Sequence, residues 1–508
     1  MIYLLPGRRD GRPASELKQR CFTRSPTWGT EQDGPFLRVV RYSAAVTDLL
    51  LTHGYFLWED PKEREIMKPY APLGLLYISA YLKRAGYDIE IFDTTFSDRA
   101  SLIARLAATP GGVLGVYTNL MTRANVLWIA EQAHQHRWTV VFGGPESANY
   151  PDDYIERGAD VVVLGEGENT LEELLPVMRD RGPHRLHGVA GTVFRDEDGV
   201  IVHNDPRDKV SDIDSLPWPD RGAIDMAQYV DTWRTHHGMG SVNLITARGC
   251  PYKCNWCSHA VFGYSHRRRD PIDCVDEVQH IVETYKPEQV WYADDVFTIS
   301  HKWLFEYADE MKRRNMKIPF ETISRADRMK KEEVLASLAE LGCYRIWIGS
   351  ESGSQRILDA MQRGVKVEEV QNATKMAKKY GIEVGMFLMW GYEGEELSDI
   401  EATIDHVKES NPDIFFTTVA YPIKNTGYYE KVKKKLIFSS DWNNSSDREL
   451  RVAGRHSRAY YKHADSWLVN AVDAHRLVDT DPVAAAVKAD AAEQARLSLL
   501  ACGDEVDV

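Results

Sequence analysis

Three cysteines within eight residues constrain this chain more than any other feature of its sequence. Cys250, Cys254 and Cys257 follow the spacing C-x3-C-x2-C. Thiolates are soft ligands that suit zinc and iron–sulfur clusters. A structural zinc site usually takes four ligands, often from two C-x2-C pairs, and no second pair follows here. The three thiolates could hold three irons of a [4Fe–4S] cluster and leave the fourth iron open, and a zinc site completed by His259 is the alternative.

The loop that carries these cysteines resembles the signature of the radical S-adenosylmethionine (SAM) superfamily. Residues 243–247 just before the loop read as a buried strand, and a helical pattern begins near Pro271. The resemblance implies that the three cysteines ligate the cluster. It also implies that Trp256, the aromatic residue before the last cysteine, lies near the adenine of SAM.

Composition indicates a globular protein of two or three domains, with 508 residues of which 43% are hydrophobic. A formal net charge of −14 argues against a nucleic-acid partner. Seven cysteines are few and odd in number, which suits a reducing cytoplasm better than a disulfide framework. Because no apolar run reaches about 18 residues and the N-terminal order does not fit a signal peptide, we expect no membrane span and a cytoplasmic location.

Residues 46–182 alternate short apolar segments with helical patterns. The expected strands occupy residues 48–54, 88–93, 113–118, 139–144 and 160–165. This pattern is typical of a doubly wound, Rossmann-like α/β domain, whose parallel sheet is covered on both faces and binds ligands beyond the carboxyl ends of its strands. Residues 1–45 precede this domain and are expected to be either a mobile tail or a lid.

The ends of these strands carry residues that suit a large planar ligand, because glycine lets a ligand approach the backbone. They are Thr118, Asn119, Gly143, Gly144, Gly165 and Glu166. With the run from Lys68 to Leu75, and with their place before the cysteine loop, they resemble the cobalamin-binding domain of one branch of the superfamily. The resemblance implies that these six residues contact cobalamin. No Asp-x-His-x-x-Gly motif occurs, so we expect either cobalamin bound without a histidine of the protein or an empty relic domain.

Residues 183–240 read as a connection that contains a hairpin at Asp198-Gly199. Within it, His236 and His237 read as polar loop residues. From 241 to 425, strand and helix alternate six times, which predicts a partial (β/α)6 barrel with its chemistry at the carboxyl ends of the strands. The basic run 267–269 reads as a solvated loop rather than an anion site. Residues 426–508 are expected to form a mostly helical extension that shapes the substrate pocket.

The strand ends of this barrel carry the remaining candidates for binding SAM. Asp294 and Asp295 follow the second strand, where the resemblance implies a carboxylate for the amino group of SAM, and the sequence does not say which one serves. Arg325 follows the third strand and could pair bidentately with the carboxylate of SAM. Glu351 and Ser352 follow the fourth, in a segment that resembles the family's ribose contact. For each acidic residue the alternative is a charge at a helix N-terminus.

The resemblance implies a reaction as well as a fold. A cluster of low potential reduces SAM to methionine and a 5′-deoxyadenosyl radical, and methylcobalamin donates a methyl group to the substrate radical. We therefore expect a cobalamin-dependent radical SAM enzyme that methylates an unactivated carbon of a small or medium-sized molecule. Its electron donor would be a protein such as flavodoxin or ferredoxin. The alternatives are a cyclase or oxidase of the anaerobic Mg-protoporphyrin monomethyl ester cyclase type, and a non-radical protein with a structural metal.

Overall fold

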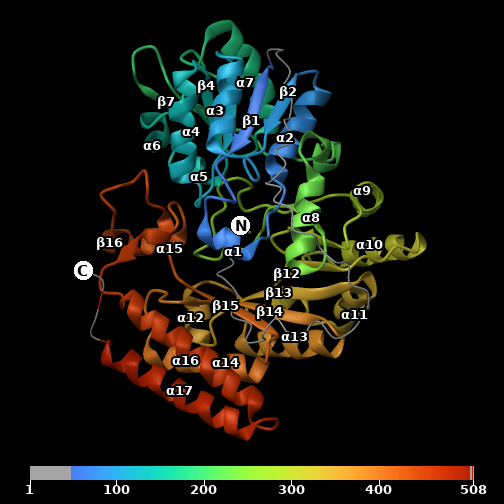
Figure 1. The fold of residues 1–508 in the computed structure, drawn as a ribbon, viewed down its shortest axis with the longest axis vertical. Helices are drawn as coiled ribbons and strands as arrows, with labels where there is room; N and C mark the ends of the chain where they lie inside the picture. Colours follow the sequence, from blue (N-terminus) through green and yellow to red (C-terminus); the bar gives the residue numbers. More distant parts are fainter. Residues whose placement is uncertain (1–46, 504–505, 507–508) are drawn as a thin grey trace, which may run out of the picture.

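The computed structural model describes residues 47–503 and 506. The interpretation of residues 1–45 as a tail or a lid lies outside the described residues. Figure 1 shows two sheet-centred domains, one above the other, with a pair of long helices at the foot. No helix in the described part of the chain is both long and apolar enough to span a membrane.

The upper domain is built on a seven-stranded sheet in the order β2-β1-β3-β4-β5-β6-β7. Its strands are β1 (Leu49–His53), β2 (Ile89–Phe92), β3 (Val113–Tyr117), β4 (Thr139–Gly143), β5 (Val161–Val163), β6 (Thr192–Arg195) and β7 (Ile201–His203). The first five are parallel, which confirms the five expected strands and the doubly wound sheet.

Side chains alternate across this sheet, so each face is covered by its own helices. Leu49 and Leu51 of β1 share a core with one helical layer, and Leu50 shares a core with the other. The first layer consists of α2 (Leu73–Arg84) and α7 (Glu168–Arg181), and the second of α3 (Arg99–Ala108), α4 (Arg123–Gln135) and α6 (Pro151–Glu156). The short helices α1 (Pro61–Ile66) and α5 (Pro145–Asn149) follow the strand ends.

The connecting segment is more ordered than the sequence suggested. The hairpin of β6 and β7 joins the upper sheet, antiparallel to β5, so this sheet extends to residue 203. His236 and His237, read as polar loop residues, are the last two residues of helix α8 (Met226–His237). The loop interpretation was wrong because Asp225 caps this helix, and its apolar residues fall at the spacing of one helical face.

The lower domain is a six-stranded, wholly parallel sheet in the order β15-β14-β13-β12-β11-β8, which confirms the partial barrel. Its strands are β8 (Ser241–Leu244), β11 (Gln289–Tyr292), β12 (Phe320–Ser324), β13 (Cys343–Glu351), β14 (Glu383–Trp390) and β15 (Ile414–Val419). Its helices are α9 (Pro271–Tyr285), α10 (His301–Arg313), α11 (Glu332–Leu341), α12 (Gln355–Ala360), α13 (Val367–Lys379) and α14 (Leu397–Ser410).

The C-terminal part divides into two pieces. Helices α16 (Arg458–Leu477) and α17 (Pro482–Ala501) form a hairpin whose apolar residues share a core with α14 and β14. The residues between β15 and α16, 421–457, form a bridge segment that lies beside the strand ends (Figure 1). The bridge segment contains α15 (Gly427–Val432) and a small ribbon of β16 (Leu436–Ile437) and β17 (Arg451–Val452).

Candidate functional site

The cysteine loop leaves the barrel immediately after its first strand. An antiparallel pair, β9 (Ala247–Arg248) and β10 (Arg267–Arg268), closes the base of the loop. Gly249 begins the loop with a φ of +85°, and a Cβ at this position would lie 2.5 Å from the carbonyl oxygen of Ser265. Only glycine meets both demands, so the local backbone fixes where Cys250 starts.

Two arginines converge on the middle cysteine. Cys254 is buried, and its Sγ lies 3.8 Å from Nη1 of Arg325 and 3.8 Å from Nη1 of Arg363. The guanidinium of Arg325 also stacks 3.6 Å from the ring centre of Tyr252. Sequence reasoning missed Arg363, which follows α12 and carries no motif that marks it. Its neighbours Gln362 and Gly364 both have positive φ, so a tight turn aims this side chain.

The chemistry of the three thiols fits an iron–sulfur cluster. Burial, with smaller contributions from Asp295 and Cys254, raises the pKa of Cys250 to about 11. Burial together with Asp295 and the other two cysteines raises the pKa of Cys257 still more. Thiols with a pKa raised in this way become thiolates beside a strong positive charge, which cluster iron supplies. The two guanidinium groups on Cys254 then offset part of the sulfur charge.

The zinc alternative lacks the geometry it needs. No three His, Cys, Asp or Glu side chains among residues 47–503 and 506 converge to hold a single metal ion. The ring of His259 instead lies 4.2 Å from that of Tyr264, centre to centre. Thiolates that ligate different irons of one cluster need not meet at a point, so this arrangement favours the cluster over zinc.

The two aspartates after β11 have different surroundings. Asp294 is buried, where Oδ1 accepts a hydrogen bond from the backbone N of Thr246 at 2.6 Å and Oδ2 accepts one from its hydroxyl at 2.5 Å. Arg268 lies 3.4 Å from the same carboxylate. Asp295 is half-buried, and no hydrogen bond to its carboxylate is found within the described residues. Asp294 therefore holds two strand ends together, and Asp295 is left to face the cysteine loop.

Glu351 is a second free carboxylate of this site. It ends β13 at an irregular step in the strand pairing, with a φ of +65° that a non-glycine residue rarely adopts. Burial raises its pKa to about 7, although Arg363 and Arg325 act in the opposite direction. No hydrogen bond to its carboxylate is found in the described chain. A strained backbone that presents an unpaired buried acid is typical of a ligand-binding position.

Arg325 and Ser352 are more occupied than the sequence suggested. Nε of Arg325 donates to Asp327 at 2.8 Å and Nη2 to the carbonyl of Arg363 at 2.8 Å, in addition to the contact with Cys254. The hydroxyl of Ser352 accepts from the backbone N of Ser354 at 3.1 Å. Both side chains shape the wall of the site, and contact with SAM by either would add to these bonds.

Trp256, expected beside the adenine of SAM, lies in the cysteine loop. It packs against a cluster of buried residues from several elements, which includes Met361, Met389, Tyr392 and Tyr428. Met389 and Tyr392 belong to the end of the fifth barrel strand and the turn that follows it. Trp256 is therefore packed against side chains at the end of another barrel strand.

The strand ends of the upper domain leave room for a ligand at β4. A Cβ added to Gly143 would meet no atom within 4 Å, whereas one added to Gly144 would lie 2.4 Å from the carbonyl oxygen of Thr118. The hydroxyl of Thr118 donates to the carbonyl of Gly143 at 3.0 Å, and Asn119 Oδ1 accepts from the backbone N of Met121 at 2.9 Å. Thr118 and Asn119 thus shape the loop, and open space over Gly143 fits a bulky cofactor.

Glu166 joins the two domains. Its carboxylate accepts from Arg248 at 2.7 Å and from Arg267 at 2.6 Å, and Glu168 accepts from Arg248 at 2.6 Å. All four charged side chains are largely buried. The side chain of Glu166 is therefore committed to the cysteine loop, and any contact it makes with cobalamin has to come from its backbone. Gly165 lies beside the same loop, near the carbonyl of Val261.

The solvated-loop interpretation of residues 267–269 was wrong. Arg267 pairs with Glu166, the guanidinium of Arg268 lies 3.8 Å from the ring centre of Trp303, and Arg269 pairs with Asp273 at 2.6 Å. These partners lie on the upper domain and on α9 and α10. The run joins the elements around the cysteine loop, and its charges are used for that purpose.

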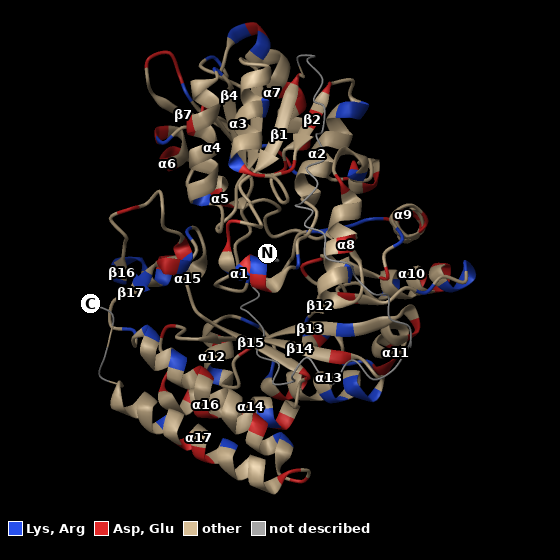
Figure 2. Ribbon diagram, in the orientation of Figure 1, with Lys and Arg blue, Asp and Glu red and all other residues tan. Residues whose placement is uncertain are grey.

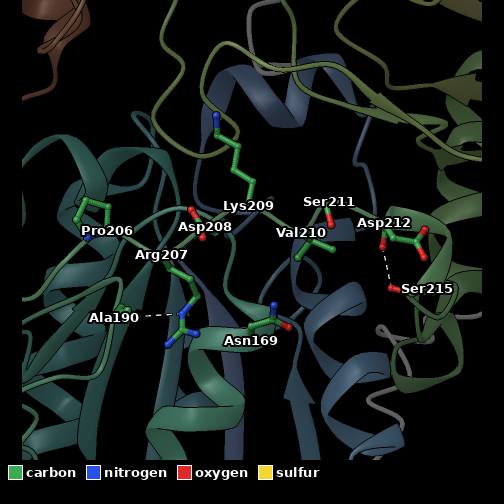
Figure 3. A pocket seen from close by; sticks show the side chains of 10 residues that line it. All are labelled: Asn169, Ala190, Pro206, Arg207, Asp208, Lys209, Val210, Ser211, Asp212 and Ser215. Carbon is green, nitrogen blue, oxygen red and sulfur yellow. Dashed lines mark hydrogen bonds between the residues drawn. The ribbon is translucent and has the colours of Figure 1, made fainter.

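A separate cavity of about 440 Å3 lies along the connecting segment (Figure 3). It is lined by Asn169, Ala190, Pro206, Arg207, Asp208, Lys209, Val210, Ser211, Asp212 and Ser215. Arg207 turns to the carbonyl of Ala190, and Lys209 extends toward Gly263 of the cysteine loop. None of the residues expected to bind a cofactor lines this cavity, so we do not assign it to the site.

Replacement of Asp295 by Asn should weaken SAM binding by at least about tenfold, because a charge-assisted bond to the amino group would be lost. Replacement of Asp294 by Asn should instead lower the free energy of unfolding by about 1–3 kcal/mol, because buried donors lose their carboxylate. Equilibrium SAM binding and thermal unfolding of the two reconstituted variants separate these effects. Weaker SAM binding in the Asp294 variant alone would reverse the assignment.

Comparison with protein families identifies both domains. Residues 244–407 match the model of the radical SAM superfamily, and residues 65–175 match that of the B12 binding domain. An uncharacterized methyltransferase of Pyrococcus horikoshii is 28% identical over 381 residues, which cover 73% of this chain and 80% of that protein. The anaerobic magnesium-protoporphyrin IX monomethyl ester cyclase of Rubrivivax gelatinosus is 26% identical over 362 residues, which cover 69% of this chain and 64% of that protein.

Two solved structures share the fold. One is the cobalamin-dependent SAM radical enzyme OxsB with aqua-cobalamin bound, which aligns with a TM-score of 0.69 at 17% identity over 84% of this chain and 67% of that chain. The other is the radical SAM methyltransferase TsrM of Kitasatospora setae with cobalamin and a [4Fe–4S] cluster bound, with a TM-score of 0.62 at 18% identity over 76% of this chain and 74% of that chain. These likenesses confirm the fold, and the two family matches place a B12 binding domain before a radical SAM domain.

Proposed function

This chain is a radical SAM enzyme with a B12 binding domain, and we propose that it methylates an unactivated carbon of a small or medium-sized molecule. The observation that carries the proposal is the apposition of two sites. Gly165 and Glu166, at the end of β5, contact the loop that holds Cys250, Cys254 and Cys257. A cofactor over the upper strand ends would then lie beside a cluster on the lower ones.

The residues of the lower site have separable tasks. The three cysteines would hold a [4Fe–4S] cluster, and Arg325 and Arg363 hold the Sγ of Cys254 in place. Among the remaining candidates, Asp295 would accept from the amino group of SAM and Glu351 from its ribose hydroxyls, while Trp256 would pack against the adenine. Reductive cleavage of SAM supplies a 5′-deoxyadenosyl radical, and cobalamin supplies a methyl group.

The upper site would hold cobalamin by its backbone. Gly143 leaves open space at the end of β4. The strand ends are surrounded by three loops, which contain Thr118 and Asn119, Gly144, and Gly165 and Glu166. No histidine ligand to cobalt is proposed, because the sequence lacks the Asp-x-His-x-x-Gly motif. The protein's contribution is to orient the cofactors and exclude water from the space between the domains.

A cyclase or oxidase is the second candidate function. It is favoured by the likeness to the magnesium-protoporphyrin cyclase of Rubrivivax gelatinosus, which covers 69% of this chain against 73% for the methyltransferase relative. We also propose a cytoplasmic protein that takes its electrons from a small redox protein such as flavodoxin or ferredoxin. The net charge of −14 supports a small-molecule substrate over a nucleic acid.

Product stoichiometry separates the two functions. A methylase of this kind uses one SAM to restore the methyl group on cobalamin and one to form the radical. The wild-type enzyme with its substrate should therefore form S-adenosylhomocysteine and 5′-deoxyadenosine in similar amounts, and the product should gain the mass of one CH2. If 5′-deoxyadenosine accompanies product while S-adenosylhomocysteine never does, the enzyme is a cyclase or an oxidase.

A further inference from the structure

The bridge segment is anchored to the cysteine loop at one end. The backbone N of Tyr428 donates to the carbonyl of Asn255 at 2.8 Å. Gly427 lies against the same asparagine, where a Cβ would be 2.9 Å from its Oδ1. Tyr428 also belongs to the apolar cluster that Trp256 contacts. Helix α15 is therefore fixed directly beside the loop that would carry the iron–sulfur cluster.

The other end is anchored to the upper domain. Asp447 is buried, and its Oδ1 accepts from the hydroxyl of Tyr150 at 2.6 Å. Trp442 lies near the guanidinium groups of Arg123 and Arg157, at 4.2 and 4.5 Å from its ring centre. The carbonyl of Ser445 accepts from Arg123 at 2.9 Å. The bridge segment thus connects the two domains beside their strand ends, as Figure 1 shows for α15 and α5.

Arg448 follows the buried Asp447 in the bridge segment, and no acidic residue of the described chain forms an ion pair with it. Its Nη1 lies 3.1 Å from Sδ of Met121, and its Cζ lies 5.9 Å from the ring centre of Tyr421. Within the described residues, no carboxylate oxygen lies within 4.0 Å of its guanidinium. A thioether is a weak acceptor, so the guanidinium of this half-buried residue has no strong hydrogen-bond acceptor within the described residues.

The contacts of Arg448 place it between the two proposed cofactor sites. Met121 belongs to the loop after β3, whose neighbours Thr118 and Asn119 surround the upper site. Tyr421 follows β15 of the barrel and lies near Cys257 of the cysteine loop. A side chain that touches both would border the space where a substrate meets both cofactors.

An acidic residue of α1 also lies near Arg448. Glu63 of α1 interacts electrostatically with Arg448 without forming an ion pair, and it accepts from the hydroxyl of Tyr55 at 2.8 Å. Burial raises the pKa of Glu63, which reduces the charge it presents at neutral pH. In Figure 2, α1 lies between the domains with charged residues at most of its positions. The guanidinium of Arg448 is therefore only weakly compensated.

We propose that Arg448 binds an anionic group of the substrate, either a carboxylate or a phosphate. The inference rests on the proposed function for the position of the substrate, and it adds the substrate's charge. A guanidinium can form two parallel hydrogen bonds to either group, which fixes orientation as well as affinity. Orientation decides which carbon of a substrate faces the radical, so Arg448 would set the methylated position.

The test uses holoenzyme reconstituted with the cluster and hydroxocobalamin, with benzoate and inorganic pyrophosphate as anion probes. Ligand-observed NMR titration measures the affinity of each probe, and benzamide serves as the neutral counterpart of benzoate. The variants are R448Q, R448K and the matched control K434Q. Lys434 is an exposed cation on the same segment, so K434Q removes an equal charge outside the space between the domains.

We expect at least one anion to bind wild type, and R448Q to weaken it by about tenfold or more. R448K should retain part of the anion affinity, and K434Q should bind the anions as the wild type does. The affinity for benzamide should be the same in the wild type and in every variant. Preference for benzoate identifies a carboxylate, and preference for pyrophosphate a phosphate. Equal anion affinity in wild type and R448Q overturns the proposal, as does loss of bound cobalamin from R448Q. Formation of 5′-deoxyadenosine by wild type is measured separately, and its absence would count against the proposed function alone.

Discussion

Replacement of Cys250, Cys254 and Cys257 together by alanine should abolish the iron–sulfur cluster of this protein. Anaerobic reconstitution of the wild type should give about four irons per chain, the content of a single [4Fe–4S] cluster. The triple variant keeps the ribbon of β9 and β10 and the turn at Gly249, but it offers no thiolate in the loop. Iron analysis and the visible absorption of the cluster should therefore both fall to background.

The matched control is Cys502→Ala, which removes one thiol at the end of α17, outside the loop. It should keep the full iron content of the wild type. Full iron in the triple variant would show that other residues hold the cluster, and iron replaced by one zinc ion per wild-type chain would favour the structural-metal alternative.

Replacement of Gly143 by Val should abolish cobalamin binding while it leaves the fold intact. The backbone of Gly143 is regular at the end of β4, and a Cβ there meets no atom within 4 Å, so the protein itself has room for the side chain. The same open space is where a cofactor would approach the backbone. A branched side chain would take that place, and affinity should fall by at least about a hundredfold, since even partial overlap costs several kcal/mol.

Wild type purified with hydroxocobalamin should show a bound, base-off cobalamin spectrum, and Gly143→Val should show none. Gly222→Val is the matched control, because Gly222 also has open space around its Cβ position and lies in the connecting segment. It should take up cobalamin as the wild type does. Normal cobalamin uptake by Gly143→Val would show that the cofactor binds elsewhere. Absence of uptake by the wild type under any condition would show that the upper domain is a relic that no longer binds cobalamin.

Much of the fold could be predicted because its signals are local. Most strands of the two sheets contain a short apolar run, and the β-then-α alternation leaves few topologies to choose from. The cysteine spacing is equally local, since one loop supplies all three sulfurs. The hairpin of β6 and β7 was also visible at Asp198-Gly199, but its pairing with β5 depends on long-range packing that no local pattern encodes.

The partners of charged side chains could not be predicted, because they lie far apart in the sequence. Asp294 and Asp295 are adjacent and chemically identical, and only the long-range contacts of Asp294 with Thr246 and Arg268 distinguish them. The sequence predicts a solvated Arg267, whereas in the structure this side chain pairs with Glu166 of the other domain. Arg363 has no motif, and its role near Cys254 comes from a turn with positive φ on either side of it.

The central claim is that the methyl group reaches the substrate through cobalamin held at Gly143. The most direct measurement gives methyl-deuterated SAM to the wild type and to Gly143→Val, each with an intact cluster, reductant and substrate. The account predicts deuterium in the product of the wild type. For Gly143→Val it predicts 5′-deoxyadenosine without labelled product or S-adenosylhomocysteine, because the lower site of the variant remains complete. Labelled product from a variant that contains no cobalamin would contradict the account.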